Sequence, residues 1–319
     1  MYIPSIAPDE FLKGYVERVT QFLGIDSSTN ARSLLVKTYG LQGSKSPSSP
    51  ELFARVLNID QAELLRLHTL ENLLNAFAER SDCGSTAGLR RPVEYTGPRS
   101  LLFSARDAGI CTECVSKDLT EFGFSYWHRL HLIRGIEYCP THPNSRLIRV
   151  GRSQAFKRTP DVHLEEYFDS EERHVQYKDR IVCSMERRYV ASCRVLLNSN
   201  SPLAGYKAVA NAIARSSTTI SLNGRPGFSR GFRPLVFYSI KAVIVCKTST
   251  QWLASSFPEL TTDTLLSFIR ALAIFSKSST ERYILACLLL GCWDADVSVE
   301  GFHEWLDRDR DERQQPATQ

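Results

Sequence analysis

Hydrophobic residues near the start of the chain recur at intervals of three and four positions. Between residues 9 and 23 the apolar positions are Phe11, Leu12, Tyr15, Val16, Val19, Phe22 and Leu23. This spacing places them on one face of a helix, so the pattern predicts an amphipathic helix. The turn-like run at 26–30 predicts the cap of a second helix that continues through residues 34–36.

Residues 51–78 follow a Ser- and Pro-containing loop at 42–50 and are strongly helical in pattern, with a break near 58–61. Asn58 stands where the turn of a helix-turn-helix needs a residue that tolerates left-handed backbone, and Asn does so. The pattern therefore predicts a helix-turn-helix-like pair. A plain helical hairpin with no DNA role is an equal alternative, because the second helix is rich in Glu and Leu.

The second half of the chain is mainly helical in pattern. Residues 162–195 are helical in pattern and highly charged at first, and 203–213 and 262–290 have wide apolar faces of helical spacing. The β-branched run 234–246 suits either a strand or a buried helix, because periodicity does not separate the two.

The predicted fold class is therefore mainly α, with a helical and helix-turn-helix-like unit, a central zinc-ribbon-like module and a C-terminal helical domain. At 319 residues the chain is long enough for roughly two domains. The predicted regions are 1–80 (helical), 81–100 (a Gly- and Pro-containing linker), 101–150 (zinc-binding), 151–306 (basic and mostly helical) and 307–319 (a disordered tail).

Two short-spaced pairs of metal-competent residues lie in the central module. Cys111 and Cys114 form the first pair, and Cys139 and His142 form the second after 24 intervening residues. Four thiolate or imidazole ligands suit a closed tetrahedral Zn²⁺ site, which favours a structural role for the metal over a catalytic one. So short a module buries too little apolar surface to fold alone and needs the metal.

The fourth ligand has an alternative, because His131 lies inside the loop between the pairs and could replace His142. Nine cysteines at irregular spacing, with zinc-type ligands among them, fit reduced thiols and a cytoplasmic setting. The longest strongly apolar stretch, 283–293, is too short for a membrane span, so no membrane association is predicted.

Charge is distributed unevenly along the chain. Residues 187–258 contain ten Lys or Arg and no Asp or Glu, although the whole chain has a net charge of only +4. Such a span suits phosphate binding, and an acidic protein surface is the competing partner. The candidate nucleic-acid contacts are Arg187, Arg188, Arg194, Arg215, Arg225, Arg230 and Arg233.

A serine hydrolase is a weaker alternative. The run Gly227-Phe-Ser229-Arg-Gly231 fits the nucleophile elbow, and Asp294 and His303 follow in the expected order. Loop-forming residues flank the run on both sides, whereas the motif needs a strand before it and a helix after it. The sequence also has no Gly-x4-Gly-Lys phosphate loop, so ATP hydrolysis would have to come from a partner.

Several motifs together resemble the TniQ family of transposition proteins. Near the start, 9–18 is similar to the family's opening, an acidic pair followed by Gly-Tyr and an Arg. In the zinc segment, 111–118, 126–131 and 135–142 follow the family motif in order. The resemblance covers roughly 2–150, and the first Cys pair lacks the Pro that often follows its leading Cys.

The resemblance implies a non-catalytic adaptor that selects a target site in DNA transposition. Such proteins bind double-stranded DNA or a target-bound CRISPR effector complex, and recruit an AAA+ transposition ATPase of the TnsC or TniB type. A homodimer is an open alternative for the oligomeric state. A zinc-containing helix-turn-helix regulator of transcription is the main rival, since it would share the DNA binding but not the ATPase partner.

Overall fold

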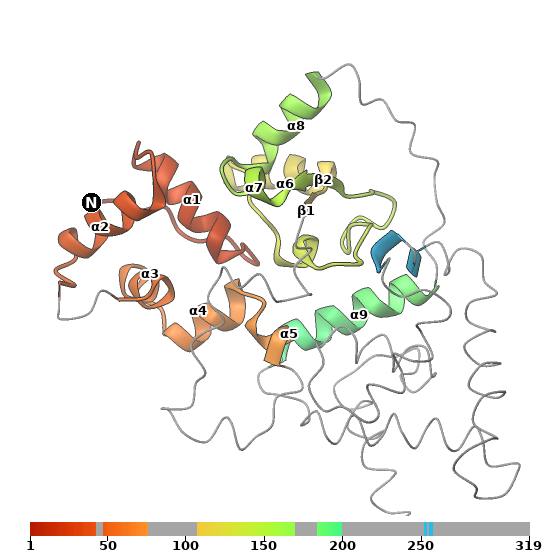
Figure 1. The fold of residues 1–319 in the computed structure, drawn as a ribbon, viewed down its shortest axis with the longest axis horizontal. Coiled ribbons are helices and arrows are strands. Elements are labelled where there is room, and N and C mark those ends of the chain that lie inside the picture. The colour runs from red at the N-terminus through yellow and green to blue at the C-terminus, as the bar shows by residue number, and fades with distance from the viewer. Residues whose placement is uncertain (43–46, 76–106, 170–183, 200–251, 254, 258–319) are drawn as a thin grey trace, which may run out of the picture. The chain divides into compact units, whose positions relative to one another are not determined.

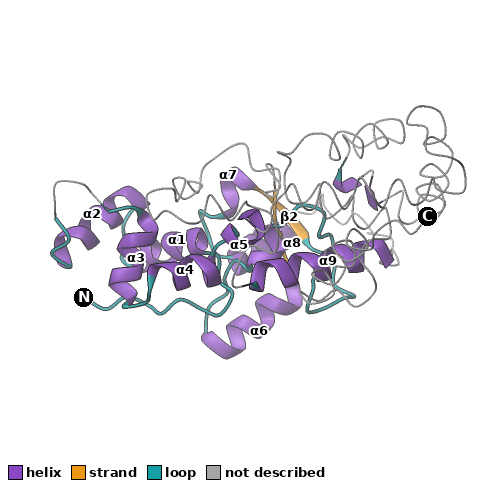
Figure 2. Cartoon of the chain, turned by 90° about the horizontal axis from the view of Figure 1, so that it is seen from below, coloured by secondary structure: helices purple, strands orange, loops and turns teal. Residues whose placement is uncertain are grey.

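The computed structural model describes residues 1–42, 47–75, 107–169, 184–199, 252–253 and 255–257. Helices dominate this part of the chain (Figure 2), in agreement with the mainly α prediction. The chain divides into two compact units. The first contains 1–71, 103–133 and 137–177, and the second contains 72–102, 134–136 and 178–319. The five regions predicted from the sequence stay a prediction.

The first two helices form where the sequence pattern predicts them (Figure 1). Helix α1 (Leu12–Phe22) buries the apolar face that contains Leu12, Tyr15 and Val19. Helix α2 (Ser28–Thr38) begins within the predicted capping run, where the Ser27 side chain accepts a hydrogen bond from the Asn30 backbone N–H. This bond satisfies one of the donors that a helix start leaves without an intrahelical partner.

Helices α3 (Ser49–Leu57) and α4 (Gln61–His68) confirm the predicted break at Asn58. Asn58 has φ 53°, the left-handed conformation that its short polar side chain tolerates. Asp60 caps α4 by accepting from the backbone N–H groups of Ala62 and Glu63. The predicted helix has a second interruption, because α4 ends at His68 and a separate helix α5 (Glu71–Asn75) follows.

The central module contains a two-stranded antiparallel sheet that hydrophobic periodicity did not reveal. Strand β1 (Asp107–Ile110) pairs with β2 (Ile148–Gly151), with Ala108 opposite Val150. Helix α6 (Thr112–Phe122) and the 3₁₀ helix η2 (Arg129–Leu132) lie between the strands in sequence. Helices α7 (Arg152–Ala155) and α8 (Pro160–Asp169) follow β2. Four-residue strands are too short to show a clear alternation.

A backbone pairing holds the start of the chain against the central module. The Phe11 N–H donates to the Trp127 carbonyl at 2.7 Å, and the Arg129 N–H donates to the Asp9 carbonyl at 3.2 Å. Between these bonds, Glu10 and His128 form an antiparallel bridge. Residues about 120 positions apart are therefore joined edge to edge, as in a small sheet.

Charged side chains reinforce the same pairing. The Arg129 guanidinium donates to Asp9 Oδ1 at 2.7 Å and to the carbonyls of Arg66 and Thr69. These bonds connect the end of α4 to the module. Because removal of one partner would leave a buried charge uncompensated, we expect this junction to tolerate little change.

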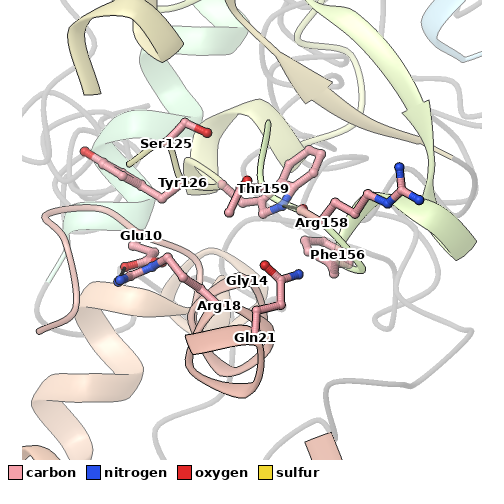
Figure 3. A pocket seen from close by; sticks show the side chains of 10 residues that line it. Glu10, Gly14, Arg18, Gln21, Ser125, Tyr126, Phe156, Arg158 and Thr159 are labelled. Atoms are coloured by element: carbon pink, nitrogen blue, oxygen red, sulfur yellow. Dashed lines mark hydrogen bonds and ion pairs between the residues drawn. The ribbon is translucent and has the colours of Figure 1, made fainter. Parts of the chain in front are cut away.

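Glu10 and Arg18 form a second buried pair. Arg18 donates to both carboxylate oxygens of Glu10, at 2.9 and 2.7 Å. Figure 3 shows the two side chains pointing toward each other, and the Ala7 backbone N–H adds a third bond to the carboxylate. Burial raises the pKa of Glu10, while the hydrogen bond and charge of Arg18 act to lower it. The pair fixes the N-terminal segment to α1 at a considerable desolvation cost.

Gly14 lets α1 approach the module closely. A Cβ atom at this position would lie 2.9 Å from Cδ1 and 3.1 Å from Cβ of Trp127. The Trp127 side chain is 3% exposed, and its indole N–H donates to the Arg158 carbonyl at 3.1 Å. Trp127 is therefore part of the core of the first unit, in line with a packing role for this residue.

The described part of the second unit centres on helix α9 (Ser184–Asn198). Its buried face includes Tyr189, Cys193, Leu196 and Leu197. The Asn72 side chain donates to the carbonyls of Leu197 and Ser199, which satisfies groups at the end of α9.

Several predicted elements lie outside the described residues. These are the linker at 81–100, the segments 203–213, 234–246 and 262–290, and the tail at 307–319. Within the described residues, every helix is too short or too polar to cross a bilayer.

Replacement of Gly14 by Ala tests the close approach. We expect Gly14→Ala to destabilise the protein by about 1–3 kcal/mol, because overpacking against Trp127 outweighs the better helix propensity of Ala. Gly151→Ala is the matched control, since nothing lies within 4 Å of its added Cβ. Urea unfolding measures both variants, and a Gly14→Ala protein as stable as wild type would contradict the packing assignment.

Candidate metal centre

Four side chains converge from two parts of the central module. Cys111 is the residue that precedes α6, and Cys114 lies in the first turn of this helix. Cys139 and His142 come from the loop between η2 and β2. Their ligand atoms all lie within 4.8 Å of one another, and the three cysteines are buried. The structure therefore brings together the four residues that the spacing singled out.

The individual distances suit a tetrahedral ion. His142 Nδ1 lies 3.5 Å from the Cys111 sulfur and 3.3 Å from the Cys114 sulfur, and the two sulfurs of Cys114 and Cys139 are 3.5 Å apart. Zinc bonds of about 2.3 Å to sulfur and about 2.0–2.1 Å to nitrogen place neighbouring ligand atoms roughly 3.6–3.8 Å apart. Small shifts of the side chains are enough to accommodate such an ion.

The local backbone orients each pair. Helix α6 starts directly after Cys111, so the first pair lies at a helix N-terminus, where the partial positive charge favours thiolates. In the second pair, the backbone N–H groups of Thr141 and His142 donate to the Cys139 sulfur at 3.4 and 3.3 Å. The Cys139 N–H donates to the Ser145 carbonyl, which closes the turn.

The thiols perturb one another strongly. Hydrogen bonds from Cys114 and Cys139 lower the pKa of Cys111, whereas the hydrogen bond to Cys111 raises the pKa of Cys114. The crowded sulfurs therefore do not all carry negative charge together without compensation. A bound divalent cation would supply this compensation and let each thiol ionise. The donor set of three sulfurs and one imidazole nitrogen fits Zn²⁺.

His131 lies beside this set and is not one of its four members. Its Nε2 is 3.4 Å from the Cys139 sulfur and 4.0 Å from the Cys114 sulfur. Burial lowers the pKa of His131 to about 3, so the imidazole is neutral at physiological pH. The geometry favours His142 as the fourth ligand and His131 as a hydrogen-bonding neighbour of a cysteine ligand.

The His128 side chain contacts a carboxylate and is not one of the four candidate ligands. Its Nε2 lies 2.9 Å from the buried Asp118 carboxylate, on the same helix as Cys114. The spacing of histidines in the loop did not distinguish these roles. The sequence signal for the role of His128 was the position of Asp118. Asp118 lies one helical turn after Cys114, so the two share a helix face and Asp118 is near the cluster.

Two hollows in the described residues lie near the candidate metal centre or the N-terminal segment. The crevice in Figure 3, lined by Glu10, Arg18 and Trp127 among others, is too narrow to admit a water molecule. A second hollow of about 520 Å³ lies beside His142 and is an open depression along α6, lined by polar residues such as Glu113 and Lys117. The hydrolase candidates Ser229, Asp294 and His303 lie outside the described residues.

The basic candidates are only partly described. Arg187 and Arg194 are exposed on α9 two helical turns apart, and Arg188 is half-buried. Arg215, Arg225, Arg230 and Arg233 lie outside the described residues. The assignment of all seven arginines as nucleic-acid contacts stays a prediction.

Comparison with known proteins tests the family resemblance. Residues 1–144 match the family model described as TniQ. The match contains the paired segments Asp9–Phe11 and Trp127–Arg129 and all four candidate metal ligands. No match to a curated protein was found. The resemblance inferred from the motifs is therefore confirmed over this part of the chain.

Metal analysis of histidine variants tests the ligand assignment. We expect about one Zn²⁺ per chain. His142→Ala should lose stoichiometric metal, whereas His131→Ala should keep it with affinity lowered by about 10- to 100-fold, as for other residues that contact a ligand. Elemental analysis gives the content, and competition with a chromophoric chelator gives the affinity.

His163→Ala is the matched control, because His163 is a buried histidine that contacts the Ala155 carbonyl and lies outside the cluster. It should bind metal as wild type does. Retention of metal by His142→Ala together with its loss from His131→Ala would exchange the two roles.

Proposed function

Because residues 1–144 match the TniQ family model, we propose that the protein is a non-catalytic target-selection adaptor in DNA transposition. It binds target DNA or a target-bound complex and recruits an AAA+ transposition ATPase. The observation that carries this proposal is that the motif residues inside the family match are also the residues that contact one another in the structure. Within the match, the motif segments Asp9–Phe11 and Trp127–Arg129 pair with each other, and four further motif residues form the candidate metal centre.

The internal contacts of the motif support a structural use of the metal. Four protein ligands close the coordination shell, so a zinc ion held by Cys111, Cys114, Cys139 and His142 has no vacant position for a substrate. Its contribution is to hold the module in one shape. A module held in one shape by a metal ion suits docking to a partner.

The partner surface that we assign lies at the N-terminus and the end of α1. Tyr2 and Phe22 are 74% and 55% exposed, and their rings contact each other edge to face at 5.9 Å. Exposed aromatic side chains that cluster are typical anchors of protein interfaces. We infer that this aromatic pair contacts the ATPase.

Helix α4 is a poor candidate for reading DNA bases. Its exposed first turn contains Glu63 and follows Asp60, so negative charge lies where a recognition helix approaches phosphates. This charge counts against the rival function of a helix-turn-helix transcription regulator. The exposed Arg187 and Arg194 on α9 are better suited to phosphate contact.

Capture of the ATPase separates the adaptor from the regulator. The full chain should retain the AAA+ ATPase of its own transposon in a pull-down. The double variant Tyr2→Ser with Phe22→Ser should weaken retention by about tenfold or more, as expected when interface anchors are removed. Leu119→Ser is the control, because Leu119 is 41% exposed on α6, away from the aromatic pair in sequence. No ATPase binding by the wild-type protein would remove the proposal.

Salt dependence tests direct DNA contact. Duplex binding should weaken steeply with salt, and Arg187→Ala with Arg194→Ala should reduce the slope of log K against log salt by about 2, one for each lost phosphate contact. Lys37→Ala with Arg55→Ala also removes two exposed positive charges and should leave the slope unchanged. If the affinity for duplex DNA does not change with salt concentration, these arginines do not contact phosphates, and another protein or complex recognises the target.

A further inference from the structure

Three aromatic side chains in the second unit form a box. Tyr189 from α9 contacts Trp252 and Phe257, with ring centroids 5.5 and 5.9 Å apart, and the latter two rings are 5.8 Å apart. Each of the three residues is at most 2% exposed. We call these three residues the aromatic box.

The aromatic box closes around Gly135. This residue has φ +86°, a conformation that favours glycine. A Cβ atom here would lie 2.9 Å from the Phe257 ring and 3.1 Å from the Tyr189 ring. Both the backbone angle and the space therefore require a residue without a side chain.

Polar contacts hold the same backbone. The Tyr189 hydroxyl donates to the Arg134 carbonyl at 2.8 Å, and the Trp252 indole N–H donates to the Gly135 carbonyl at 2.7 Å. Arg134 Nε in turn donates to the Ser256 carbonyl, and its guanidinium lies 5.0 Å from the Phe257 ring centroid. Aromatic residues whose polar ends find partners in this way bind one backbone conformation specifically.

The segment that the aromatic box contacts, residues 134–136, lies between the two ligand pairs in the chain. We call it the gripped segment. Residues 134–136 belong to the second unit, whereas 133 and 137 belong to the first. Arg134 follows His131 by three residues, and Ile136 precedes the candidate ligand Cys139 by three. The box therefore holds the loop that joins the two ligand pairs close to its end, a few residues before Cys139.

We propose that the aromatic box couples metal binding to the order of α9. A bound ion fixes the backbone on the Cys139 side of the gripped segment, which presents the carbonyls of Arg134 and Gly135 in the conformation that the box binds. Loss of the ion lets this backbone relax, and α9 loses the contacts of Tyr189 with Arg134 and Gly135. The inference goes beyond the proposed function and rests only on the metal centre.

Coupling of this kind is reciprocal. If metal binding stabilises the contacts of the box, then loss of those contacts must weaken metal binding by the same factor. The double variant Tyr189→Phe with Trp252→Phe removes both hydrogen bonds to the segment and keeps three aromatic rings. We expect its metal affinity to fall by about 10- to 100-fold, since two hydrogen bonds of ordinary net strength correspond to such a factor.

Hydrogen–deuterium exchange of the full chain tests the forward direction. Removal of the metal from the wild-type protein with a chelator should speed exchange of the buried α9 amides by about tenfold or more. In the double variant, α9 should exchange faster before chelation and change little when the metal is removed. Ser192→Ala is the control, because the Ser192 hydroxyl donates within its own helix to the Arg188 carbonyl. It should keep the wild-type response and metal affinity.

If the double variant does not fold, the single variant Tyr189→Phe replaces it in both measurements. Its metal affinity should also fall, by a smaller factor. Unchanged α9 exchange after verified removal of the metal would overturn the proposal. Wild-type metal affinity in the folded variants would overturn it equally. Neither measurement uses the ATPase or DNA, so failure here is distinguishable from failure of the proposed adaptor function.

Discussion

The closure of residues 115–138 by two pairs of metal-competent side chains is the constraint on which the described structure depends. Two stretches within this loop make the contacts that organise the chain. Trp127–Arg129 pairs with the N-terminal segment of the first unit, and Arg134–Ile136 is held by the aromatic box of the second unit. A metal ion at the ends of the loop would therefore restrict the backbone from which both sets of contacts are made.

The pairing with the N-terminal segment explains why the two ends of the TniQ match belong together. Asp9 and Arg129 form an ion pair, Gly14 leaves room for Trp127, and Arg18 binds the carboxylate of Glu10. Each of these residues lies in a motif by which the family resemblance was first inferred. Together these residues fix one interface, which gives a physical reason for their joint presence in the motifs.

The buried charges at this interface and the buried thiols of the metal-ligand cluster make both costly to disturb. Glu10 and Arg129 are nearly inaccessible to solvent, and the three clustered cysteines need a cation before all can ionise. Such groups favour a single arrangement, because every alternative leaves a buried charge or donor without its partner. That specificity suits the adaptor function that we propose.

The sequence by itself indicated two pairs of candidate ligands, the amphipathic helix α1 and the turn at Asn58, because ligand spacing, helical periodicity and left-handed backbone are local properties. Only the tertiary structure decided what depends on distant residues. It separated His142 from His131, paired Asp9 with Arg129, formed the short β1–β2 ribbon and enclosed Gly135 in aromatic rings. These contacts join positions far apart in the chain, where no periodic pattern signals which partner a residue meets.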